Sequence, residues 1–280
     1  MLKIDFKVLR SESLRDIIYA LEGAVQNIGI DYYLIGAVAR DAWFQLEHII
    51  SRRTSDIDFA ILMPEQKQFD ELKTFLSKQK GYVETKGNSF TMISPEGTVI
   101  DILPFGSVEI DETVNATYGT VKIATNGFKE IYDAALASFD TDDEQLKVKV
   151  ASLSGIVLLK LIAHKDRPEL RIKDPGDILE IFRHYFDLHT AFIYEHHADL
   201  FEKETSLEII ATRVIGRNIG DIIKGNPYLR KKISDYLASE IAKHENSSLI
   251  RLMQRSSERY RQEEITTMIQ ELLKGIREGN

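Results

Sequence analysis

The stretch from residue 54 to residue 62 constrains the fold more than any other part of the chain. It reads Thr-Ser-Asp-Ile-Asp-Phe-Ala-Ile-Leu, so that Asp56 and Asp58 alternate with apolar residues. In an extended strand residues i and i+2 share a face, which places Ile57 and Phe59 toward a core and both carboxylates on the opposite face. Two adjacent anions repel each other, and a divalent cation between them offsets that repulsion. The stretch therefore predicts a strand with a metal site on one face.

Length and composition are those of an ordinary globular protein. The 280 residues, 43% hydrophobic and 29% charged, are enough for two domains. The chain has no cysteine, which excludes disulfides and thiolate metal sites. No apolar run approaches the roughly 20 residues of a membrane span, and the first residues lack a signal-peptide pattern. We therefore expect a cytoplasmic protein without a membrane partner.

The charge is unevenly distributed along the chain. The formal net charge is −8, whereas residues 226–280 contain ten Lys and Arg against eight Asp and Glu. Arg251, Arg255 and Arg259 form one stripe of a predicted C-terminal helix. This stripe either binds the backbone of an RNA or pairs with the nearby glutamates.

Hydrophobic periodicity predicts strands that alternate with helices, followed by a meander and then by helices alone. This order indicates an α/β (α+β) fold, with a mixed sheet and flanking helices over residues 1–145 and a helical domain over residues 146–280. The boundary is placed after the acidic stretch 138–144, which is predicted to be a linker. The expected helices span 13–27, 37–50, 65–79 and 155–164, and the expected strands span 32–35, 56–63, 82–85, 89–93, 98–103, 120–124 and 148–151.

Three further features accompany the aspartate pair. Gly36 and Ala37 connect a strand to a helix, where a small turn lets backbone N–H groups approach phosphate oxygens. Asp101 lies at the centre of the apolar strand Val-Ile-Asp-Ile-Leu, and a carboxylate there is costly unless it is paired or bound to metal. Lys160 lies in an apolar helix, and Asp174 and Asp177 begin the next one.

These residues resemble the pattern of the nucleotidyltransferase superfamily. That pattern is a strand ending in Gly-Gly or Gly-Ser, a helix, a hydrophobic-Asp-x-Asp-hydrophobic strand and a third acid on a later strand. The chain is most similar to bacterial AbiEii-like proteins, predicted nucleotidyltransferases of abortive-infection toxin–antitoxin systems. The similarity extends over residues 30–190 and includes Ile-Asp-Ile-Leu-Pro-Phe-Gly at 100–106, the helix with Lys160, and Lys-Asp-x-x-Asp at 173–177.

The resemblance implies transfer of a nucleotide from a nucleoside triphosphate to a hydroxyl group. Two Mg²⁺ ions, with Mn²⁺ as an alternative, would be held by Asp56, Asp58 and Asp101, and Asp101 would accept the proton. Gly36, Ala37 and Arg40 would contact phosphate, and Lys160 would face the β- and γ-phosphates. Asp174 and Asp177 would bind nucleotide, orient Lys160, or pair with Lys165 and Arg167.

Two departures from the pattern keep alternatives open. Ala37 stands where the pattern has a second Gly or Ser, and eighteen residues separate it from Asp56, more than is usual. The leading hypothesis is a metal-dependent nucleotidyltransferase, which by the resemblance would be a toxin with a cognate antitoxin and with tRNA or another RNA as its acceptor. One alternative is adenylyl transfer to a small molecule such as an aminoglycoside, and the other is a non-catalytic nucleotide-binding protein.

Overall fold

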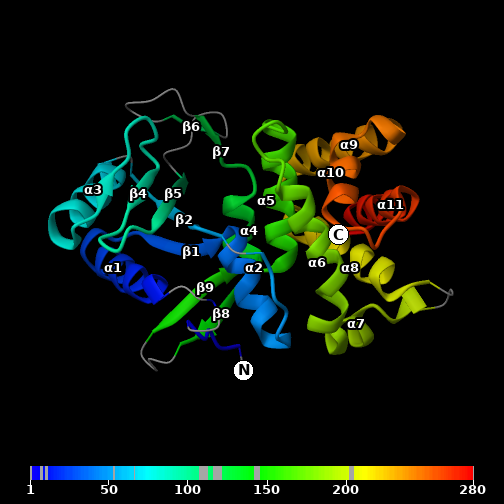
Figure 1. The fold of residues 1–280 in the computed structure, drawn as a ribbon, viewed down its shortest axis with the longest axis horizontal. Coiled ribbons are helices and arrows are strands. Elements are labelled where there is room, and N and C mark those ends of the chain that lie inside the picture. Colours follow the sequence, from blue (N-terminus) through cyan, green and yellow to red (C-terminus); the bar gives the residue numbers. More distant parts are fainter. Residues whose placement is uncertain are drawn as a thin grey trace. The chain divides into compact units, whose positions relative to one another are not determined.

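The computed structural model describes residues 2–6, 9, 12–52, 54–65, 67–106, 113–115, 122–141, 146–201 and 205–279. The chain divides into two compact units, Met1–Ala151 and Ser152–Asn280 (Figure 1). The sequence placed the domain boundary after residue 145, in a stretch of which residues 142–145 lie outside the described part of the chain. The strand Lys147–Ala151 pairs within the sheet of the first unit, so the division falls after this strand.

The first unit combines a mixed sheet with helices. Its elements are α1 Glu12–Ile28, β1 Asp31–Ile35, α2 Gly36–Phe44, η1 Gln45–Glu47, β2 Asp56–Met63, α3 Lys67–Lys80, β3 Val83–Glu84, β4 Thr91–Ile93, β5 Val99–Gly106, β6 Thr113–Asn115, β7 Lys122–Ala124, α4 Phe128–Ala134, β8 Leu136–Asp140 and β9 Lys147–Ala151. The main sheet has the order β3-β4-β5-β2-β1-β9-β8, and β6 pairs with β7 separately. This architecture confirms the predicted α/β class.

The centre of the sheet is formed by its most apolar strands. β2 runs antiparallel to β1 and parallel to β5. Along β2, Ile57 and Phe59 are buried, whereas Asp56 is exposed and Asp58 is half-buried. The predicted alternation along this strand is therefore observed.

Two predictions for this unit were wrong. The helix expected over 37–50 ends as a short 3-10 turn at Glu47, because His48 adopts the left-handed conformation with φ of 55°. The linker expected over 138–144 begins as part of β8, which pairs with β9 through Asp140. Phe139 explains this, since its fully buried ring packs edge-on against Trp43 at a centroid distance of 5.1 Å.

The second unit is built from helices. Its elements are α5 Leu153–Asp166, α6 Asp174–Leu188, α7 Thr190–His196, η2 Ala198–Phe201, α8 Leu207–Ile222, α9 Pro227–Ala242, η3 His244–Asn246, α10 Ser248–Ser256 and α11 Gln262–Glu278. Every regular element that the structure describes in this unit is a helix (Figure 1). Throughout the described residues, no helix is long and apolar enough to cross a membrane.

Glycines bring the backbones of α8 and α11 into contact. Gly216 and Gly220 are one turn apart on α8, and Gly275 and Gly279 are one turn apart at the end of α11. A Cβ atom on Gly216 would lie less than 3.0 Å from the carbonyl oxygen of Leu272 and 2.9 Å from the Cα of Gly275. Real Cβ atoms essentially never come this close to backbone, so the contact requires residues without side chains.

We therefore predict that Gly216→Ala destabilises the protein. The added methyl group meets backbone atoms that cannot rotate away, and overpacking of this kind costs about 1–3 kcal/mol. Gly225→Ala is the matched control, because nothing lies within 4 Å of a Cβ at that position. Chemical denaturation of both variants checks the prediction. Equal midpoints for Gly216→Ala and Gly225→Ala would contradict it.

Candidate active site

Asp58 and Asp101 are neighbours on adjacent parallel strands. In the register of β2 with β5, Asp58 lies directly opposite Asp101. Residues opposite each other in a parallel pair project from the same face, and Asp56 shares that face because it lies two residues before Asp58. Asp58 and Asp101 are half-buried, and Asp56 is exposed. The sheet therefore places all three predicted carboxylates on one face.

Gly36 packs directly against Asp58. It follows Ile35, which pairs with Asp58 in the antiparallel β1–β2 register, and it begins α2. Its φ of +71° lies in the region that favours glycine, and a Cβ atom there would be 2.9 Å from the Cγ of Asp58 and closer still to Oδ2. The start of α2 is also an electrostatically favourable place for a carboxylate. The absence of a side chain at Gly36 therefore leaves the space that the Asp58 carboxylate occupies.

The remaining carboxylates are held by hydroxyl groups. Ser55 Oγ donates a short hydrogen bond to Asp56 Oδ1. Thr91 Oγ1 on β4 donates to Asp101 Oδ1 at 2.5 Å, and Asn88 Nδ2 donates to Thr91 Oγ1 at 2.7 Å. Thr91 and Asn88 could not be predicted from the sequence, because only the pairing of β4 with β5 brings them to Asp101 and no local pattern encodes that register.

Arg40 is buried in the first unit. Its side chain is 1% exposed, and its Nε and Nη2 atoms donate to Asp41 Oδ1 at 2.9 and 2.7 Å. Ser51 Oγ donates to the same oxygen at 2.6 Å. The guanidinium group is thus engaged by a neighbouring acid, and its contact with phosphate stays a prediction. The same holds for Ala37, which is buried in the first turn of α2.

The other predicted residues form a buried cluster in the second unit. Lys160 Nζ on α5 donates to Asp174 Oδ1 at 2.7 Å and to Asp177 Oδ2 at 2.8 Å, both on the first turn of α6. The side chains of the three residues are 3–11% exposed, so their charges compensate one another away from water. The sequence left open whether these acids bind nucleotide, orient Lys160, or pair with Lys165 and Arg167, and the structure shows both of them in contact with Lys160. Contacts of all three with nucleotide stay predictions.

His164 lies one turn beyond Lys160 on α5. It is buried, and its Nδ1 atom is 2.6 Å from Tyr236 Oη on α9. Burial lowers the pKa of His164 below its ordinary value, although Glu240 and Asp174 oppose this shift. The contact of His164 with Tyr236 joins α5 to α9.

The carboxylates of the first unit suit a magnesium or manganese ion. Asp58 and Asp101 supply hard oxygen ligands side by side, which is the donor type that Mg²⁺ and Mn²⁺ prefer. Among the described residues no three His, Cys, Asp or Glu side chains form a ready-made ligand cluster. Mg²⁺ in phosphate-transfer sites is bound by one or two carboxylates together with substrate phosphates. The residues therefore fit an ion that is bound together with a triphosphate.

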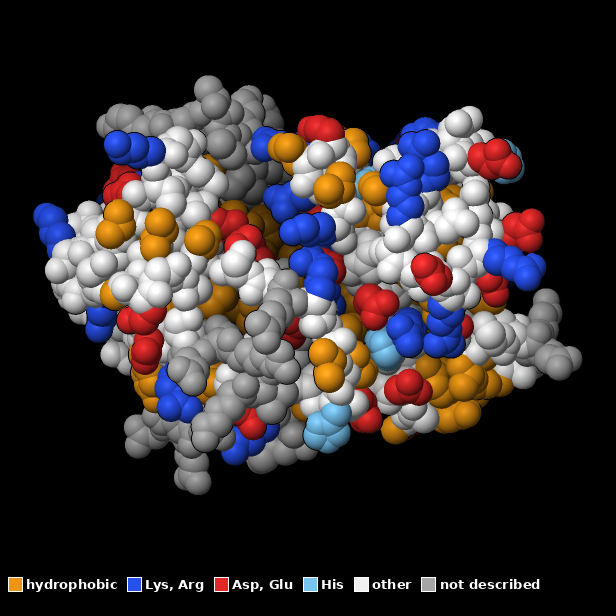
Figure 2. Space-filling view, in the orientation of Figure 1, with side chains coloured by type: hydrophobic (Ala, Val, Ile, Leu, Met, Phe, Trp, Pro, Cys, Tyr) orange, Lys and Arg blue, Asp and Glu red, His pale blue; other side chains and the backbone are white. Residues whose placement is uncertain are grey.

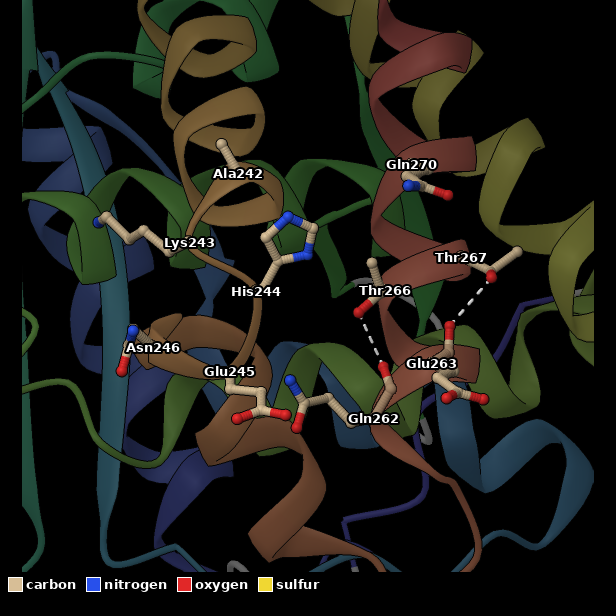
Figure 3. A pocket seen from close by; sticks show the side chains of 10 residues that line it. All are labelled: Ala242, Lys243, His244, Glu245, Asn246, Gln262, Glu263, Thr266, Thr267 and Gln270. Carbon is tan, nitrogen blue, oxygen red and sulfur yellow. Dashed lines mark hydrogen bonds between the residues drawn. The ribbon is translucent and has the colours of Figure 1, made fainter.

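Two cavities of the second unit are lined by none of these candidates. One, of about 920 Å³, lies between the end of α9 with η3 and the start of α11 (Figure 3). There the hydroxyl groups of Thr266 and Thr267 donate to carbonyl oxygens of their own helix, at 2.8 and 2.9 Å. A second, of about 580 Å³, borders ion pairs of Arg213 and Arg217 with acids of η2 and α11. In both cavities these polar side chains are therefore engaged in contacts within the helical unit, and they do not converge on a common point as catalytic groups would.

Comparison with known proteins identifies the family. No curated protein matches the sequence. A solved structure, the solution structure of the antibiotic-resistance factor ANT(2″)-Ia, is 14% identical over 67% of this chain and 98% of that chain, with a TM-score of 0.33. The family model described as nucleotidyl transferase AbiEii toxin, type IV TA system, matches residues 4–277. With carboxylates on β2 and β5 beside a glycine turn, and a family match along nearly its whole length, the chain belongs to the AbiEii family of nucleotidyltransferase toxins.

Proposed function

We propose that the protein is a metal-dependent nucleotidyltransferase that transfers a nucleoside monophosphate from a nucleoside triphosphate to a hydroxyl group of RNA. The observation that carries this proposal is the direct pairing of Asp58 with Asp101, with Gly36 packed against Asp58. The family match supports the reaction class. The nucleoside triphosphate donor, the metal ion and the RNA acceptor are themselves proposed.

The chemistry follows from the groups available. The acceptor hydroxyl attacks the α-phosphorus, a new P–O bond forms, and the bond to the leaving pyrophosphate breaks. Asp101 is the candidate for accepting the hydroxyl proton, and Asp56 and Asp58 complete the anionic face. A bound Mg²⁺ or Mn²⁺ ion supplies Lewis acidity that lowers the pKa of the hydroxyl group and offsets the charge on the triphosphate.

The second unit offers a basic surface for a polyanionic acceptor. Arg251 and Arg255 are exposed on α10, and neither forms an ion pair with a residue that the structure describes. Arg171 and Lys173 are exposed just before α6. The first turn of α6 packs close to the end of α10, since a Cβ atom on Gly176 would lie 2.9 Å from the Cβ of Ser256. Figure 2 shows Lys and Arg side chains gathered on the visible face of this unit. Phosphate groups of RNA suit such a surface.

The predicted arginine stripe is shorter than the sequence indicated. Arg259 lies beyond the end of α10 and forms an ion pair with Glu208 on α8 at 2.6 Å. Its guanidinium group is therefore engaged within the second unit, and the RNA contact is proposed for Arg251 and Arg255. The toxin description of the family makes a cognate antitoxin the expected genetic partner.

We predict that purified protein with Mg²⁺ transfers label from one α-labelled nucleoside triphosphate to RNA. The Asp56→Asn/Asp58→Asn double variant should transfer none, since both substitutions remove anionic oxygen ligands. Gel electrophoresis of the labelled RNA measures the transfer and identifies the donor nucleotide. Label on a small molecule instead of RNA would contradict the proposed acceptor. Absence of label from every product would contradict nucleotidyl transfer.

We also predict that Gly36→Ala lowers kcat/KM about 100-fold, because a methyl group there displaces the Asp58 carboxylate and small misplacements of reacting groups have effects of this size. Gly29→Ala is the matched control. Gly29 has a similar positive φ of +74°, but nothing lies within 4 Å of a Cβ at that position. Both variants should lose about 1–2 kcal/mol of stability from backbone strain. Similar kcat/KM values for the two variants would show that Gly36 does not position Asp58.

A further inference from the structure

Asp101 is held by a hydrogen-bonded chain that begins outside the strands of the candidate active site. Thr91 lies opposite Asp101 in the antiparallel pairing of β4 with β5. Its side-chain oxygen is 2.5 Å from Asp101 Oδ1, and the residue is only 9% exposed. The contact is thus a short, part-buried hydrogen bond to one oxygen of the carboxylate.

The direction of this chain is fixed by Asn88. The backbone N–H of Phe90 donates to Asn88 Oδ1 at 3.1 Å, which identifies the oxygen end of the amide. The nitrogen end, Nδ2, lies 2.7 Å from Thr91 Oγ1 and can only donate. Since the Thr91 hydroxyl accepts from Asn88, its single hydrogen is left for Asp101. Asn88 therefore donates to Thr91, and Thr91 in turn donates to the Asp101 carboxylate.

The turn between β3 and β4 holds Asn88 in place. Thr85 Oγ1 donates to the carbonyl oxygen of Asn88 at 2.8 Å and also lies 3.1 Å from that of Thr91. The backbone N–H of Thr91 donates to the same Asn88 carbonyl at 3.2 Å. The start of the chain is therefore anchored in the backbone rather than at a freely rotating side chain.

We propose that Thr91 and Asn88 are positioning residues that orient the Asp101 carboxylate for metal binding. This inference rests on the proposed function, since it concerns the same site. A carboxylate that accepts a hydrogen bond at one oxygen has its plane fixed before the ion arrives, and it loses less rotational freedom on binding. Partners of this kind change metal affinity or activity by 10- to 100-fold when they are removed from known metal sites.

The inference is tested by measuring Mn²⁺ affinity directly, with electron paramagnetic resonance of free Mn²⁺ in the presence of a non-hydrolysable nucleoside triphosphate. Thr91→Val keeps the branched shape but removes the hydroxyl group, and it should weaken Mn²⁺ binding about tenfold or more. Thr91→Ser keeps the hydroxyl group and should bind as the unaltered protein does. Asn88→Ala frees the Thr91 hydroxyl to rotate and should weaken binding less than Thr91→Val.

Thr98→Val is the matched control for loss of a threonine hydroxyl close to β5. Thr98 Oγ1 pairs with Ser13 Oγ at 2.7 Å and precedes Val99. Its replacement should leave Mn²⁺ affinity unchanged. The melting temperature of Thr91→Val is compared with that of Thr98→Val. If Thr91→Val melts at a lower temperature, the Mn²⁺ affinity of Asn88→Ala tests the inference instead, because Asn88 lies outside the strands.

Two results would overturn the inference, and they are distinguishable. Unaltered Mn²⁺ affinity in both Thr91→Val and Asn88→Ala, while the unaltered protein binds Mn²⁺ and transfers nucleotide, would remove the positioning role and leave the proposed function intact. Failure of the unaltered protein to bind Mn²⁺ at all would remove both.

Discussion

The parallel pairing of β2 with β5 is the constraint on which the candidate active site depends. Its register sets Asp58 opposite Asp101, and a slip of one residue would send one carboxylate to the other face of the sheet. The antiparallel pairing of β1 with β2 then brings Gly36 beside Asp58. The burial of Ile57 and Phe59 on the opposite face stabilises this register, because a slip would expose both side chains. The geometry of the candidate active site and the packing of the core are thus determined by the same strands.

The parts of this arrangement that the sequence predicted are those with local signals. Alternation of acidic and apolar residues over 56–59 predicted a strand and the shared face of Asp56 and Asp58, and the small residues at 36–37 predicted the turn into α2. Strand order and register are long-range properties, so Thr91 and Asn88 gave no local sign of their contact with Asp101. For the same reason the acidic stretch beginning at Ser138 resembled a linker, although pairing with β9 and burial of Phe139 make its first residues a strand.

The second unit follows a different principle, in which buried charge is compensated within the helices. Lys160 between Asp174 and Asp177 joins α5 to the start of α6, where the helix dipole also favours the two acids. The sequence left several roles open for the two acids, and the structure shows that both contact Lys160. Removal of one partner from a buried cluster of this kind leaves an uncompensated charge at a cost of about 3–5 kcal/mol. Loss of activity after substitution here must therefore be separated from loss of folding.

The most direct test of the central claim is a crystal structure with Mn²⁺ and a non-hydrolysable nucleoside triphosphate, in which anomalous scattering locates the metal. We expect an Mn²⁺ peak within coordination distance of carboxylate oxygens of Asp58 and Asp101, with phosphate oxygens completing its coordination. Mn²⁺ bound instead at Asp174 and Asp177, with no peak beside Asp58 and Asp101, would contradict it. In that case the paired strands would have a structural role, and the chemistry would belong to the second unit.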